Sequence, residues 1–138
     1  MPPAAAGRDE LPLELSVTVG SGLFGGWQAR WDGDRLVYDR LGPGFTRDVQ
    51  EELWPSASDW RRFWADVERI GVWAWRRRYD ADGGDPEASW QLRLARPGRR
   101  IESEGRNGAE PDDGRGAAMP ELLAALRRLL GGRAFGES

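Results

Sequence analysis

Residues 56–71 read SASDWRRFWADVERIG, and the interpretation of the whole chain starts from this stretch. Ser56 and Asp59 have the spacing of a capping box, in which the serine hydroxyl accepts from the N3 amide and the acid accepts from the cap nitrogen. Apolar residues then recur at intervals of three and four, and Gly71 is a typical helix stop. The stretch predicts a helix over 57–70 whose buried face carries Trp60, Phe63, Trp64, Val67 and Ile70.

The chain before this helix alternates apolar and polar residues with the period of half-buried strands. Residues 13–19 form the first such run, and residues 27–31 form the second after a glycine-rich turn. An Asp-Gly-Asp turn signal at 32–34 predicts a hairpin that returns through residues 36–38. Residues 49–54 are predicted as a short edge strand.

The chain after the helix repeats this arrangement. Residues 72–79 alternate just beyond a glycine stop, so a strand is predicted there rather than a helix extension. Residues 90–95 and 99–104 form a predicted hairpin around Pro97-Gly98. Pro120 suits the start of a second helix, which carries five leucines and ends at Gly131-Gly132.

The pattern Trp-Gln-x-Arg-apolar occurs at 27–31 and again at 90–94, and each copy opens a predicted hairpin. The two copies are 63 residues apart, and adding 63 to the numbers of several apolar residues in the first helix gives apolar residues of the second. The sequence therefore predicts an α+β fold, with an antiparallel sheet of about six or seven strands and two helices on one face. The halves are either a duplicated β-β-β-α unit or a single sheet in which two hairpins are similar by convergence.

Eight tryptophans stand in this chain of 138 residues. Periodicity assigns six of them to the core, namely Trp27, Trp31, Trp60, Trp64, Trp73 and Trp90. Trp54 and Trp75 are the least constrained by any pattern, which makes them candidates for contact with a partner.

Length and composition limit the possible domain organisation, partners and chemistry of the chain. We expect one domain over residues 11–132 between disordered tails at 1–10 and 133–138.

The chain has 20 arginines, no lysine and 23 acidic residues, so its net charge of −3 does not favour nucleic acid or anionic lipid. It has no histidine and no cysteine, which excludes disulfides, thiolate zinc sites and a cysteine nucleophile. No apolar run approaches the roughly 20 residues that cross a bilayer, and a cytoplasmic location is expected.

Two groups of residues are candidates for a site. Alternate carboxylates in an acidic segment with glycines could bind Ca²⁺ or Mg²⁺, or could be a solvated loop: Asp80, Asp82, Asp85 and Glu87. Aromatic, arginine and loop residues could bind a partner: Trp54, Trp75, Arg77, Tyr79, Arg106 and Asn107. Strand alternation splits the arginines of 76–78 between two faces, so stacking on a nucleic acid strand is not favoured.

A further set of residues resembles a pattern of small, uncharacterised bacterial domains that are rich in tryptophan and have an α+β fold. The set comprises Trp60 and Phe63, Trp73 and Trp75 with Tyr79, Trp90, and then Gly105, Asn107 and Pro111. The match covers roughly residues 54–130 and leaves the first hairpin outside, and residues 86–89 depart from it by lacking an Asp-Gly turn. The resemblance implies one cooperative fold and brings no activity with it.

The sequence thus favours a non-enzymatic binding or regulatory module. Its surface would be the helix-free face of the sheet, with Gln28, Arg30, Gln91 and Arg93, or the loops beside that face. The partner would be another protein or a second copy of the chain. The alternative is a divalent-metal-dependent enzyme or metal-binding protein that uses the acidic loop 80–87.

Overall fold

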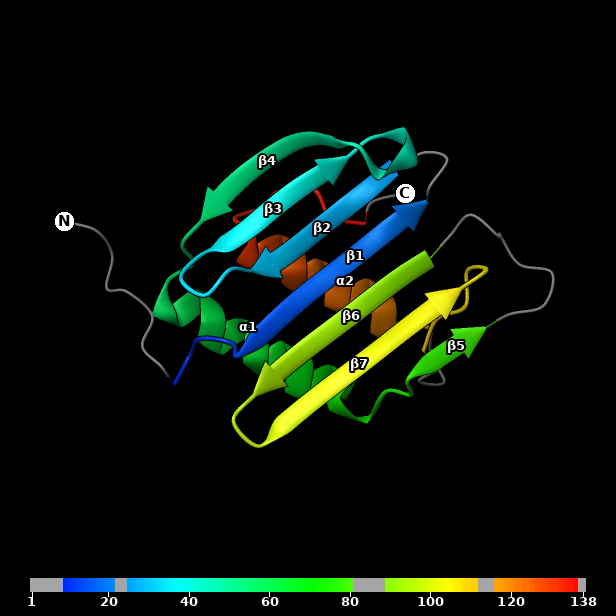
Figure 1. Ribbon diagram of the computed structural model, residues 1–138. Coiled ribbons are helices and arrows are strands. Elements are labelled where there is room, and N and C mark those ends of the chain that lie inside the picture. Colours follow the sequence, from blue (N-terminus) through cyan, green and yellow to red (C-terminus); the bar gives the residue numbers. More distant parts are fainter. Residues whose placement is uncertain (1–8, 22–24, 81–88, 112–115, 137–138) are drawn as a thin grey trace.

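The computed structural model describes residues 9–21, 25–80, 89–111 and 116–136, which form a seven-stranded sheet with both helices on one face (Figure 1). The strands are β1 (Glu14–Ser21), β2 (Gly25–Trp31), β3 (Leu36–Leu41), β4 (Arg47–Leu53), β5 (Arg78–Asp80), β6 (Ser89–Arg96) and β7 (Arg99–Arg106). The helices are α1 (Ala57–Ile70) and α2 (Ala118–Leu129), and short 3₁₀ turns are η1 (Pro43–Phe45) and η2 (Val72–Ala74). The predicted α+β class is confirmed, as are the hairpins and the capping box of α1.

The strand order is β4-β3-β2-β1-β6-β7-β5. All neighbours are antiparallel except β5 and β7, which are parallel, so the prediction of a wholly antiparallel sheet is wrong at this pair. Both edges of β6 are occupied, by β1 on one side and β7 on the other, so β5 cannot pair with β6. β5 therefore joins the sheet next to β7, and β7 runs in the same direction as β5.

Of the strand predicted over 72–79, only residues 78 and 79 are in a strand, β5, and the prediction is wrong over 72–77. α1 ends at Gly71 in the left-handed conformation with φ 83°, and η2 follows at once. A turn with three residues per repeat places Val72 and Trp75 on the same side, and both are buried. Strand alternation would instead place Trp73 and Trp75 on the same side, whereas the Trp73 side chain is only half-buried.

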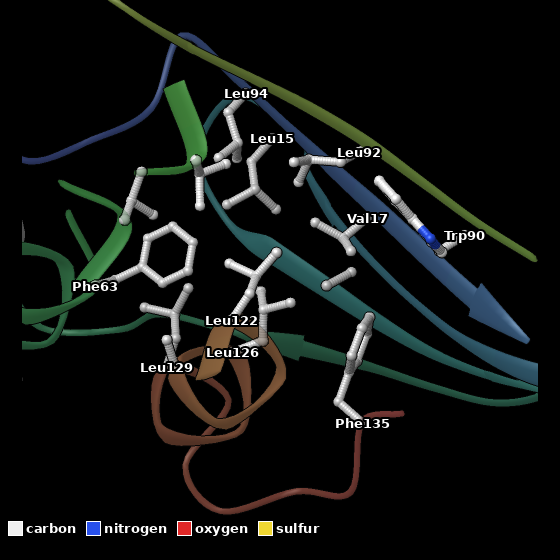
Figure 2. Close-up of a cluster of buried hydrophobic side chains, with 14 of the residues drawn as sticks. Leu15, Val17, Phe63, Trp90, Leu92, Leu94, Leu122, Leu126, Leu129 and Phe135 are labelled. Atoms are coloured by element: carbon white, nitrogen blue, oxygen red, sulfur yellow. The ribbon is translucent and has the colours of Figure 1, made fainter. Parts of the chain in front are cut away.

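The core lies between the sheet and the two helices. Figure 2 shows side chains from the sheet facing those from the helices: Leu15, Val17, Leu92 and Leu94 against Phe63, Leu122 and Leu126. These side chains are at most 2% exposed, and burying each contributes roughly 1.5–3 kcal/mol. The arrangement leaves the opposite face of the sheet without a helix.

The tryptophans divide between the core and its margin. Trp60 and Trp90 are buried as predicted. Four others assigned to the core are half-buried and pack against it instead: Trp27, Trp31, Trp64 and Trp73.

The domain is longer at both ends than predicted. Phe135 is fully buried, and Ala134 accepts a hydrogen bond of 2.7 Å from the Tyr38 hydroxyl. A disordered tail beginning at residue 133 is therefore wrong, because an apolar side chain there completes the core beside α2. At the other end, Trp64 Nε1 donates to the Glu10 carbonyl at 2.6 Å, so residue 10 also belongs to the domain.

Leu13 does not share the core face with Leu15. It precedes β1 and is 66% exposed, so the buried alternation starts two residues later than predicted.

The two halves of the chain pair their strands differently. β1 pairs with β2, the next strand in the chain, whereas β5 does not pair with β6. The duplicated β-β-β-α unit therefore stays a prediction.

Candidate binding surface

The predicted metal ligands lie mostly outside the described residues. Asp82, Asp85 and Glu87 fall in the range 81–88, which the structure does not describe. Asp80 ends β5, and its Oδ1 accepts a hydrogen bond of 2.9 Å from Asn107 Nδ2. The described ranges bring no three acidic side chains together as a metal site would require.

Arg106 and Asn107 stand at the end of β7. Arg106 is exposed and lies opposite Asp80 in the parallel pairing. Asn107 adopts a left-handed backbone with φ 57°, a conformation in which asparagine is several-fold enriched. Its bond to Asp80 closes the turn against β5, which favours a structural role for this pair.

Trp75 and Tyr79 are buried, so neither offers an exposed surface. Both rings pack on Trp90, with centroids 5.7 Å and 5.9 Å away. Trp90 Nε1 in turn donates to the Ala109 carbonyl at 2.8 Å. The cluster thus joins β5, β6 and the chain after β7, and it leaves Trp75 little surface for the partner contact predicted for it.

The three arginines of 76–78 each have an intramolecular contact. The Arg76 guanidinium lies over the Tyr79 ring, 4.7 Å from its centroid. Arg77 pairs with Glu102 at 3.4 Å, and Arg78 pairs with Glu104 at 3.1 Å. The charges of Arg77 and Arg78 are thus compensated by glutamates of β7.

The helix-free face carries a row of polar side chains that crosses all seven strands, which we call the polar row. In strand order it comprises Gln50, Asp39, Gln28, Thr18, Gln91, Glu104 and Arg78. Gln28 Nε2 donates to the Thr18 hydroxyl at 3.2 Å, and Gln50 Nε2 donates to Asp39 Oδ1 at 2.9 Å. The predicted positions of Gln28 and Gln91 on this face are confirmed, since both lie opposite Thr18.

Ion pairs neutralise the β6–β7 part of this face. Glu102 lies between Arg93 at 3.8 Å and Arg77 at 3.4 Å. Glu14 pairs with Arg100 at 3.4 Å. Each charge has a partner of opposite sign on a neighbouring segment, so this half presents little net field to an incoming molecule.

Asp39 is a buried carboxylate that the sequence interpretation missed. It is fully buried on the helix-free face, where Arg47 Nε approaches Oδ1 to 3.1 Å and Arg30 Nε approaches Oδ2 to 3.7 Å. One carboxylate therefore orients two guanidinium groups from strands on either side. In the sequence, Asp39 is a carboxylate on the polar side of a predicted strand. Its burial can be recognised only when the strand order, with β3 between β2 and β4, is known.

A shallow hollow of about 400 Å³ opens beside this cluster. It is lined by Thr18, Gln28, Leu41, Arg47 and Gln91, among others. Amide, hydroxyl and guanidinium groups give it hydrogen-bonding capacity next to β4.

A second hollow, of about 570 Å³, lies where α1 meets the β6–β7 turn. Trp64 and Trp73 stack there with centroids 6.3 Å apart. Arg96 lies over Trp64 and Arg99 over Trp73, and Arg99 also donates to Glu68. This hydrogen bond lowers the pKa of Glu68 and raises that of Arg99. Because guanidinium groups cover these indole rings, the cluster serves to attach α1 to the hairpin.

The β4 margin differs from the rest of the surface. β4 is the last strand on its side of the sheet, and six of its seven residues are exposed (Figure 1). Among the described residues, three large apolar side chains are exposed: Leu13, Val49 and Trp54. Val49 lies on β4, and Trp54 follows its last residue. The prediction that Trp54 is available for contact is thus consistent with its 63% exposure.

No helix in the described part of the chain is long and apolar enough to span a membrane. No protein-family model matches the chain, and a search of curated proteins finds no match. The resemblance to small tryptophan-rich bacterial domains therefore stays a prediction that rests on the residues quoted for it.

Proposed function

We propose that this chain is a non-enzymatic binding module that meets a protein partner at the β4 margin, where the helix-free face of the sheet ends. The observation that carries the proposal is the exposure of Trp54, at 63%. Tryptophan is the residue type most enriched among those that dominate binding energy, because its large ring excludes water on contact. Val49, 42% exposed on the same margin, adds a second apolar contact.

The chemistry of the margin supports a protein rather than a nucleic acid as the partner. β4 contains Asp48, Glu51 and Glu52 against the single basic residue Arg47. An acidic strand repels phosphates, whereas a polypeptide can supply both basic and apolar side chains. Gln50 and Gln28, in the adjoining part of the polar row, add amide groups that can hydrogen-bond at the rim of an interface.

A library of random peptides displayed on phage, selected on the immobilised chain, tests this proposal. We expect the selected peptides to bind the native protein and the Leu13→Ala variant equally, and to lose binding to Trp54→Ala. Leu13 is the matched control, because it is as exposed as Trp54 and does not lie on β4. Selected peptides that bind Trp54→Ala as well as the native protein would contradict the proposed surface.

A further inference from the structure

We propose that β4 accepts an extended, basic segment of a partner protein as an eighth strand of the sheet, with an apolar side chain of that segment packed on Trp54. The inference rests on the proposed function and specifies the conformation and charge of the partner.

The two edges of the sheet are not equivalent. β4 has seven residues and pairs with β3, whereas β5 at the other edge has three. The register between β3 and β4 shifts between Arg40 and Leu41, and from Val49 to Leu53 it is regular. A regular edge strand presents alternating N–H and C=O groups along its outer side, which is the template for adding a strand.

A second copy of the chain is a poor occupant of this edge. When two copies of one strand pair antiparallel about a twofold axis, residues that lie opposite each other point to the same face. Because side chains alternate between the two faces, the numbers of two opposing residues are both even or both odd, and the pair is centred on one residue. Centring the pair on Glu51 or Glu52 sets two identical carboxylates opposite each other. Centring it on Gln50 sets Asp48 opposite Glu52. Like charges directly opposite destabilise a sheet, so the regular part of β4 disfavours its own copy.

The sheet itself shows how its carboxylates are neutralised. Asp39 lies between arginines from two different strands, Arg30 and Arg47, and Glu102 likewise lies between Arg77 and Arg93. A carboxylate flanked by two guanidinium groups is thus a recurring arrangement on the helix-free face.

Glu52 has the first half of this arrangement. Arg35 reaches it from the inner side at 3.5 Å, and the Glu52 side chain remains 50% exposed. Glu51 is similar, since it pairs with Arg133 and is 43% exposed. A basic residue on an added strand would supply the second cation to each, on the outer side of β4.

Trp54 and Val49 fix where the apolar side chains of the added strand lie. They are five positions apart, which corresponds to about 16 Å along an extended chain and places them on opposite faces of the sheet. A segment of about six or seven residues therefore spans both contacts. Since opposing residues lie on the same face, the expected partner places apolar residues opposite Val49 and Trp54 and two adjacent basic residues opposite Glu51 and Glu52.

The test uses a synthetic nine-residue peptide with Val-Thr-Arg-Arg-Thr-Val at its centre, titrated into the isotopically labelled protein at physiological salt. We expect amide chemical-shift changes along 47–54 and slower hydrogen exchange of β4 amides. The same peptide with N-methyl groups on alternate amides cannot form the backbone hydrogen bonds to β4. We therefore expect its Kd to be about tenfold higher or more. Shift changes that lie elsewhere, or equal affinity for the methylated peptide, would overturn strand addition.

Three variants, together with the methylated peptide, distinguish this inference from the proposed function. The double variant Glu51→Gln and Glu52→Gln should weaken the peptide several-fold, whereas Glu104→Gln, on β7, should not. If Trp54→Ala weakens both peptides while methylation changes nothing, docking at Trp54 stands and strand addition fails. If Trp54→Ala changes neither affinity, the proposed function fails as well.

Discussion

The guanidinium of Arg96 lies over the indole ring of Trp64, 4.7 Å from its centroid, and both groups also bind the segment that precedes β1. Arg96 donates to the carbonyls of Asp9 and Leu11 at 2.6 Å and 3.0 Å, while Trp64 Nε1 donates to the Glu10 carbonyl. This pair therefore connects the N-terminal segment to both α1 and β6.

Replacing Arg96 should destabilise the fold. Arg96→Ala removes a cation–π contact and two charge-assisted hydrogen bonds, so we expect the free energy of unfolding to fall by about 1–3 kcal/mol. Arg93→Ala is the control, because Arg93 is exposed on the helix-free face and should change it by about 0.5 kcal/mol or less. Urea denaturation measures both, and equal effects would show that the Arg96 contacts contribute nothing specific.

Gly105 is required by the packing of Trp90. A Cβ at position 105 would lie 2.1 Å from Trp90 Nε1 and 2.5 Å from the Ala109 carbonyl oxygen. Gly105→Ala should therefore cost about 1–3 kcal/mol, since overpacking displaces the indole and its hydrogen bond. Gly42→Ala is the matched control, because its Cβ would approach nothing closer than 3.5 Å. Thermal or urea unfolding that ranks the two variants equally would contradict this packing.

The pair formed by Glu68 and Arg99 predicts a pH dependence. Arg99 donates a hydrogen bond to Glu68 and holds the pKa of that carboxyl below its ordinary value of 4.5. A lowered pKa in the folded state contributes stability above pH 4.5, and this is lost as pH falls through the folded-state pKa. The stability difference between native protein and Glu68→Gln should thus be largest near neutral pH and shrink in acid. A difference that stays constant down to acid pH would show that the pair does not act in this way.

Divalent metal is expected to have no effect on stability. A site that binds the folded state alone, filled at a hundred times its Kd, would add about 2.7 kcal/mol and raise the Tm. We expect the Tm with millimolar Ca²⁺ or Mg²⁺ to equal that with chelator. A clear rise, abolished by Asp82→Asn together with Asp85→Asn, would favour the metal-dependent alternative over a binding module.

Local patterns in the sequence predict most elements of this fold. The capping box at Ser56 and the alternation of Leu15 and Val17 depend on near neighbours, so they can be recognised without the tertiary structure. The strand predicted at 72–79 is wrong over 72–77 for the same reason, because alternation cannot be told from a 3₁₀ turn when Val72 and Trp75 are both apolar.

Features that depend on distant partners could not be predicted. Phe135 is buried in a segment that Arg127 of α2 and Tyr38 of β3 hold by hydrogen bonds, and Asp39 is buried where arginines from β2 and β4 approach it. β5 pairs with β7 and not with β6, because both edges of β6 are occupied. Of the candidate binding residues, Trp54 remains exposed and Trp75 does not, a difference that composition alone does not reveal.

The affinity of Trp54→Ala for a phage-selected peptide, measured by calorimetry beside its free energy of unfolding, tests the central claim most directly. Because Trp54 is 63% exposed, we expect the unfolding energy to change by about 0.5 kcal/mol or less. We expect the Kd to rise about tenfold or more, as for a residue that dominates an interface. An unchanged Kd in a stable variant would contradict the assignment of the β4 margin as the docking surface.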